Sequence, residues 1–92
     1  MGRSVLVTGG NRGIGLAIAR AFAFEGASLM INGFGDPAEI EEIRQELETS
    51  SGSQVLYDEA DLSDAGAIEA MVKRCAHELR SPDILVNNAG IP

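Results

Sequence analysis

The sequence predicts an α/β fold in which a parallel sheet is covered by helices on both faces. Short continuous apolar runs, typical of strands that are buried on both sides, alternate with longer segments whose apolar residues recur at helical spacing. Glycines and polar residues follow the strands, where sheets of this kind bind their ligands. Strands that alternate with helices of this length form parallel sheets with right-handed crossovers.

The first strand is expected over residues 4–8 (SVLVT), followed by a helix over 14–24 that Gly26 ends. Four apolar residues at helical spacing are expected to form the side of this helix that faces the sheet: Ile14, Ile18, Ala21 and Phe22.

The second strand is expected over residues 28–32 (SLMIN), and a helix capped by Asp36 with Pro37 in its first turn follows it. Ser51-Gly52 ends that helix, and its buried stripe consists of Ile40, Ile43 and Leu47.

The third strand is expected within residues 54–61, and Ser63 is expected to cap a third helix that stops at Ser81-Pro82. A fourth strand over 83–86 (DILV) then leads into NNAG. The predicted strand order is 3-2-1-4, which is one half of a doubly wound (Rossmann) sheet within a single dinucleotide-binding domain over residues 1–92.

Composition narrows the possible partners. The chain has 92 residues, 45% of them hydrophobic, which suffices for one small core. Its formal net charge of −7 argues against a nucleic-acid partner. We find no signal peptide and no run of 18 apolar residues, and Cys75 is the single cysteine. We therefore expect a soluble protein of the cytoplasm with no membrane partner.

The segment TGGNRGIG, residues 8–15, lies between the first strand and the first helix. Backbone N–H groups at such a helix start attract a phosphate. The segment lacks the lysine of a G-x-x-x-x-G-K-[ST] loop, which argues against a nucleotidase. Gly9 is suited to the tight turn, Gly13 to the approach of a pyrophosphate, and Gly15 to close packing of helix on strand. A glycine-rich turn without a ligand is the alternative.

Three motifs at strand ends, namely TGGNRGIG, AD-L at residues 60–62 and NNAG at 87–90, resemble the short-chain dehydrogenase/reductase family. Residues 32–42 (NGFGDPAEIEE) and 55–63 (VLYDEADLS) are similar to the 3-hydroxybutyrate dehydrogenase branch of that family. The resemblance spans essentially the whole chain but only the first part of a family member.

The resemblance implies a set of cofactor-binding residues. Gly9, Asn11, Arg12, Gly13 and Ile14 would surround the pyrophosphate and the adenosine ribose, and Asp61 and Leu62 would lie beside the adenine. Gly15 of the glycine motif and Phe34 of the NGFGD segment belong to the same expected set, and Asn88, Ala89 and Gly90 would line the ribose nearer the nicotinamide. The alternative for Asp61 is a solvent-exposed acid at a strand end that binds no ligand. For Asn87 the alternative is an amide that only hydrogen-bonds neighbouring strands to each other.

Cofactor choice is left open between NAD and NADP. Family members that prefer NAD usually carry an acid at the end of the second strand, where this chain has Asn32. Arg12 is suited to a 2′-phosphate and favours NADP. The NGFGD segment favours NAD, because the branch that it resembles uses NAD. We expect NAD, with NADP as the alternative.

No catalytic residue and no metal site are expected in this chain. The family's chemistry requires a tyrosine with a lysine four residues later, whereas Tyr57 and Lys73 are the one tyrosine and the one lysine and cannot form that pair. One hypothesis is therefore the cofactor-binding N-terminal portion of a 3-hydroxybutyrate-dehydrogenase-like oxidoreductase. The other is a stand-alone or engineered half-fold with a nucleotide-binding or structural role.

The fourth strand is interior in the family, and its outer neighbour is not in this sequence. An apolar edge that is left unpaired recruits another strand. We therefore expect a homodimer in which two fourth strands pair antiparallel across a two-fold axis.

Overall fold

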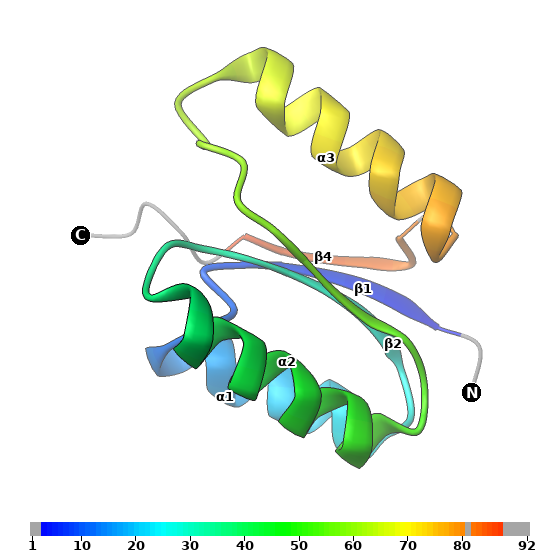
Figure 1. Cartoon of the computed structure of the whole chain (residues 1–92). Helices are drawn as coiled ribbons and strands as arrows, with labels where there is room; N and C mark the ends of the chain where they lie inside the picture. Colours follow the sequence, from blue (N-terminus) through cyan, green and yellow to red (C-terminus); the bar gives the residue numbers. More distant parts are fainter. Residues whose placement is uncertain (1–2, 81, 88–92) are drawn as a thin grey trace.

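The computed structural model describes residues 3–80 and 82–87. Seven elements follow one another in the predicted alternation (Figure 1): β1 (Ser4–Thr8), α1 (Gly13–Phe24), β2 (Ser28–Asn32), α2 (Pro37–Ser51), β3 (Val55–Asp58), α3 (Ala65–Glu78) and β4 (Ile84–Asn87). The four strands form one parallel sheet in the order β3-β2-β1-β4, as the sequence predicts.

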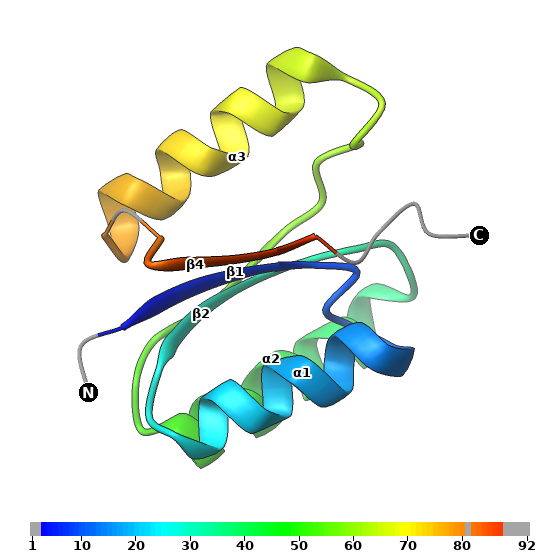
Figure 2. The same ribbon diagram turned by 180° about the vertical axis from the view of Figure 1, so that it is seen from behind.

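The sheet is the middle layer of three. Helices α1 and α2 lie side by side on one face and α3 lies on the other, which Figure 2 shows from behind. Side chains of β1 alternate between the two faces, so that Val5 and Val7 pack with the α1 and α2 side while Leu6 packs with Met71 and Cys75 of α3. Both faces of β1 are therefore buried, which explains its unbroken apolar sequence.

The buried side of α1 differs from the predicted one. Ile14 is 71% exposed and Ala21 is exposed as well, whereas the buried residues are Gly15, Ala19 and Ala23. Small side chains at this spacing let the helix axis approach the sheet closely, and the larger Ile18 and Phe22 are half-buried. The prediction followed the bulk of the side chains: it was wrong for Ile14 and Ala21, whereas Phe22 does pack against the core.

The second helix begins and ends as predicted. The Asp36 carboxylate accepts from the backbone N–H of Glu39 at 3.1 Å, and Gly52 ends the helix in the left-handed conformation with φ of 70°.

The cap of α3 is Asp64 and not Ser63 as predicted. The Asp64 carboxylate accepts from the backbone N–H groups of Gly66 and Ala67 at 2.9 and 3.3 Å. The hydroxyl of Ser63 instead donates to Asp61, so the helix begins one residue later.

No helix within the described ranges is long and apolar enough to cross a membrane.

Candidate dinucleotide site

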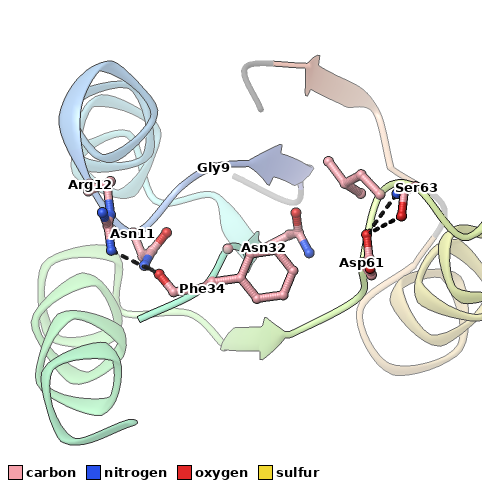
Figure 3. Close-up of a pocket in the computed structure, with 9 residues that line it drawn as sticks. Gly9, Asn11, Arg12, Asn32, Phe34, Asp61 and Ser63 are labelled. Atoms are coloured by element: carbon pink, nitrogen blue, oxygen red, sulfur yellow. Dashed lines mark hydrogen bonds between the residues drawn. The ribbon is translucent and has the colours of Figure 1, made fainter. Parts of the chain in front are cut away.

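The carboxyl ends of β1, β2 and β3 meet at one edge of the sheet and enclose a pocket of about 380 Å³ (Figure 3). A parallel sheet brings together the loops that follow its strands, so each loop supplies part of the wall. The lining residues are Gly9, Asn11, Arg12, Asn32, Gly33, Phe34, Asp61, Leu62 and Ser63.

The loop between β1 and α1 leaves the start of the helix open. Gly9 and Gly13 have φ angles of 65° and 56°, in the region that favours glycine. Arg12 is the N-cap residue and its side chain makes no capping hydrogen bond. A Cβ atom at Gly13 would meet no other atom within 4 Å. The first turn thus presents backbone N–H groups beside open space, which suits an anion.

Side chains of this loop reach across to the loop after β2. Asn11 Nδ2 donates to the carbonyl oxygen of Phe34 at 2.8 Å, and Arg12 Nη2 donates to the same oxygen at 3.1 Å. Asn11 is 7% exposed, whereas the ring of Phe34 is left 59% exposed. The two loops are therefore fixed to each other while the ring stays available to a ligand.

The ends of β2 and β3 are joined by two further side chains. Asn32, 1% exposed, donates from Nδ2 to the carbonyl oxygens of Asp58 and Ala60 at 3.1 and 3.0 Å. The hydroxyl of Tyr57 donates to the carbonyl oxygen of Gly33. Burial, together with the negative charges of Glu59 and Asp58, raises the pKa of that hydroxyl, so it remains a proton donor.

Asp61 lies in the loop after β3 at the far side of the pocket (Figure 3). Its Oδ1 accepts from the backbone N–H of Ser63 at 2.9 Å and from the Ser63 hydroxyl at 2.7 Å. These two bonds lower the pKa of the carboxyl, the backbone bond more than the hydroxyl bond. Asp61 is therefore a charged acceptor at neutral pH, with the lone pairs of its second oxygen available to a ligand.

The expected cofactor-binding residues that line the pocket are Gly9, Asn11, Arg12, Phe34, Asp61 and Leu62. Gly13, Ile14 and Gly15 lie beside it at the start of α1, where Gly15 is buried against the sheet. Asn88, Ala89 and Gly90 lie outside the described residues.

Sequence reasoning missed Asn32, Gly33 and Ser63 as parts of the pocket wall. In the sequence, Asn32 stands out only as the position where an acid is absent, and Ser63 only as a helix cap. Gly33 stands out in the sequence only as part of the NGFGD segment.

The profile of the short chain dehydrogenase family matches residues 3–92. The chain belongs to this family.

Relatives within the family match nearly the whole of this chain. The D-beta-hydroxybutyrate dehydrogenase of Cupriavidus necator is 47% identical over 91 residues, which cover 98% of this chain and 34% of that protein. A dehydrogenase/reductase of Sinorhizobium meliloti 1021 superposes with a TM-score of 0.88 at 39% identity, over 98% of this chain and 35% of the other. L-sorbose reductase of Gluconobacter frateurii, solved with NADPH and L-sorbose, superposes with a TM-score of 0.86 at 34% identity, over 97% and 34% of the two chains.

The chain spans about one third of the length of the curated relatives that it matches, 34% and 35% for the two hydroxybutyrate dehydrogenases. The one tyrosine, Tyr57, is in β3, and the one lysine, Lys73, is on α3. In residues 3–80 and 82–87 there is no group of three or more His, Cys, Asp or Glu side chains that would hold a metal ion.

A second hollow of about 370 Å³ adjoins the pocket on the side of α2. It shares Asn11 and Arg12 with the first, and its other polar lining residues include Asp36 and Glu39. One guanidinium and two carboxylates therefore face the space beyond the end of β2.

Proposed function

We propose that this chain is the cofactor-binding N-terminal part of an NAD-dependent oxidoreductase similar to the 3-hydroxybutyrate dehydrogenases. The observation that carries the proposal is the pocket at the carboxyl edge of the sheet, where an open helix start and a charged acceptor lie on opposite sides. The identity of 47% with a D-beta-hydroxybutyrate dehydrogenase supports the same assignment. A cytoplasmic location belongs to the proposal and rests on the single, buried cysteine.

The pocket suggests how the dinucleotide lies. Its pyrophosphate would bind at the start of α1 beside Gly13, where the backbone N–H groups and the helix dipole favour negative charge. The adenine would lie between the ring of Phe34 and the side chain of Leu62, and its exocyclic amine would donate to Asp61. The resemblance assigns the ribose nearer the nicotinamide to Asn88, Ala89 and Gly90, which lie outside the described residues.

We propose NAD rather than NADP as the cofactor. A 2′-phosphate beyond the end of β2 would approach Arg12, which attracts it, but also Asp36 and Glu39, which repel it. Arg12 already donates one bond to the Phe34 carbonyl. L-sorbose reductase, a structural neighbour, was solved with NADPH, so the phosphorylated cofactor is the alternative to NAD. Arg12 is the residue whose replacement distinguishes the two cofactors.

Binding is the role that we propose for this part of the protein, and hydride transfer requires residues that it does not contain. The proton-transfer groups would come from the part of the relatives that this chain does not match. The purified chain is therefore expected to bind the cofactor without turning over D-3-hydroxybutyrate.

We also propose that two copies associate along β4. In the described residues β4 pairs with β1 on one side only, and Leu85 on the α3 side of the sheet is 62% exposed. Beside it lies an apolar groove of about 400 Å³, bounded by Leu6, Met71 and Val72. Two β4 strands paired antiparallel across a two-fold axis would satisfy both edges and bring the two Leu85 side chains together.

Sedimentation tests the association. At micromolar concentration we expect twice the chain mass of 9.7 kDa, and a shift to monomer in Leu85→Lys because two charges would face each other across the axis. Phe24→Lys, at a side chain that is 81% exposed at the end of α1, is the matched control and should remain dimeric. A wild-type monomer, or a control that also dissociates, contradicts the proposed interface.

Calorimetric titration with NAD tests the binding role. Gly13→Ala and Gly52→Ala form a matched pair, because both glycines have positive φ and at neither would a Cβ atom meet another atom within 4 Å. Each substitution is expected to cost about 1 kcal/mol of folding free energy. Only Gly13→Ala, whose new methyl group would occupy the space of the pyrophosphate, should also abolish binding. Equal effects of the two variants on binding would refute the site.

A further inference from the structure

The side chain of Asn11 lies where the loops after β1 and β2 meet at the pocket wall. It is 7% exposed and donates to the Phe34 carbonyl at 2.8 Å. We propose that Asn11 is a positioning residue that holds the ring of Phe34 in place as a wall for the adenine, and that Gly33 is required to make room for it. This inference rests on the proposed dinucleotide function.

Gly33 is required for space and not for backbone conformation. It is not one of the glycines with positive φ, so its backbone conformation does not call for glycine. A Cβ atom there would lie 1.9 Å from Asn11 Oδ1 and 2.8 Å from Asn11 Cγ, distances at which Asn11 has to move. Any side chain at residue 33 therefore displaces the amide of Asn11 from the Phe34 carbonyl.

The backbone carbonyls on both sides of the Cα atom of Phe34 accept hydrogen bonds from side chains of the two flanking segments, the loop after β1 and β3. Asn11 and Arg12 donate to the carbonyl of Phe34, and the Tyr57 hydroxyl donates to the carbonyl of Gly33. The ring itself is 59% exposed. In Figure 3 it extends from its backbone toward the side of the pocket that holds Asp61.

In this arrangement the backbone of Phe34 is held by protein side chains, and its ring is left to contact the ligand. Side chains of the loop after β1 and of β3 hold the backbone on the two sides of the Phe34 Cα atom, and the aromatic face remains free for stacking. An aromatic residue whose backbone is fixed before the ligand arrives loses less conformational entropy on binding. Asn11 therefore acts on the adenine through Phe34, while the pyrophosphate is bound elsewhere, at the start of α1.

The test is a double-mutant cycle on ADP-ribose affinity, measured by NMR with circular dichroism to confirm folding. Asn11→Ala should weaken ADP-ribose about 3- to 10-fold, the range for one lost hydrogen bond. Gly33→Ala should weaken it at least as much. The double variant should bind no worse than Asn11→Ala alone, because the displaced amide is then absent. Gly66→Ala, where the new Cβ has only an ordinary contact at 3.4 Å, is the control and should bind as the wild type does.

A second readout separates positioning from mere stability. Nuclear Overhauser contacts between the Phe34 ring and the adenine protons should be present in the wild type and lost in Gly33→Ala. Additive losses in the cycle, or contacts that persist in Gly33→Ala, overturn the inference. Should Gly33→Ala fail to fold, refolding on addition of Asn11→Ala supports the clash and continued unfolding overturns it. A wild type that does not bind ADP-ribose refutes the proposed function itself, whereas binding that is equal in all variants refutes only the role of Asn11.

Discussion

Replacing Asn32 by aspartate is predicted to destabilise the protein strongly, although the family resemblance leads us to expect an acid at the end of the second strand in members that prefer NAD. Asn32 is 1% exposed, and its amide group donates to the carbonyl oxygens of Asp58 and Ala60. A carboxylate has no hydrogen to donate and would place negative charge against two carbonyl oxygens. The ends of β2 and β3 would then repel each other where the pocket is built.

The size of the effect follows from these two bonds. Their loss costs about 1 kcal/mol each, so Asn32→Leu, which keeps the branched shape of the side chain but has no donor, should lose about 2 kcal/mol. Burying an unpaired charge raises the loss for Asn32→Asp to roughly 3–5 kcal/mol at pH 7. A chain of this size has about 5–15 kcal/mol of stability in total, so the aspartate variant would be close to unfolding.

Urea unfolding followed by circular dichroism measures the free energy of unfolding of both variants. Its pH dependence separates the cost of the lost hydrogen bonds from the cost of the buried charge. Burial raises the pKa of the new carboxyl above its value in the unfolded chain. The extra loss of Asn32→Asp relative to Asn32→Leu is therefore full above the folded pKa and disappears below the unfolded one, where the protonated acid also regains one donor. An aspartate variant as stable as the wild type at pH 7 would refute the structural role of Asn32.

Two further predictions concern the charged residues of the pocket. Arg12→Ser should weaken NAD only slightly, because Asn11 still donates to the Phe34 carbonyl. Should Arg12 instead hold a 2′-phosphate, calorimetry would show NADP weakened by about 1–3 kcal/mol more than NAD, which would contradict our choice of NAD. Ser63→Ala should raise the pKa of Asp61 toward the usual value, because one of its two hydrogen bonds is lost. Carbon-13 NMR titration of the carboxyl measures this, and an unchanged pKa would mean that the Ser63 hydroxyl contributes nothing.

The order of elements and of strands was predictable because it depends on repeated local signals. An unbroken apolar run marks a strand that is covered on both faces, and the caps Asp36 and Gly52 mark the ends of α2. The inward face of α1 was not predictable from apolar bulk. That face is set by how closely the helix approaches the sheet, which selects Gly15, Ala19 and Ala23 over larger neighbours.

That Gly9, Asn11, Arg12 and Asp61 line one pocket was predictable from the positions of the motifs after the strands, because the loops of a parallel sheet meet at the same edge. The partners of buried amides were not predictable. Asn32 bonds to residues 26 and 28 positions away, and nothing in the local sequence indicates that its donors are used in this way.

The most direct test of the account is a titration of the nitrogen-15-labelled chain with ADP-ribose, followed by backbone NMR shifts. We predict saturable shifts at Gly9, Gly13, Phe34 and Asp61, with none at the hollow formed by Arg3, Phe22, Glu25 and Ala27. Saturable binding whose shifts lie away from the carboxyl edge of the sheet, or no binding at millimolar ligand, would contradict the assignment of this chain to cofactor binding.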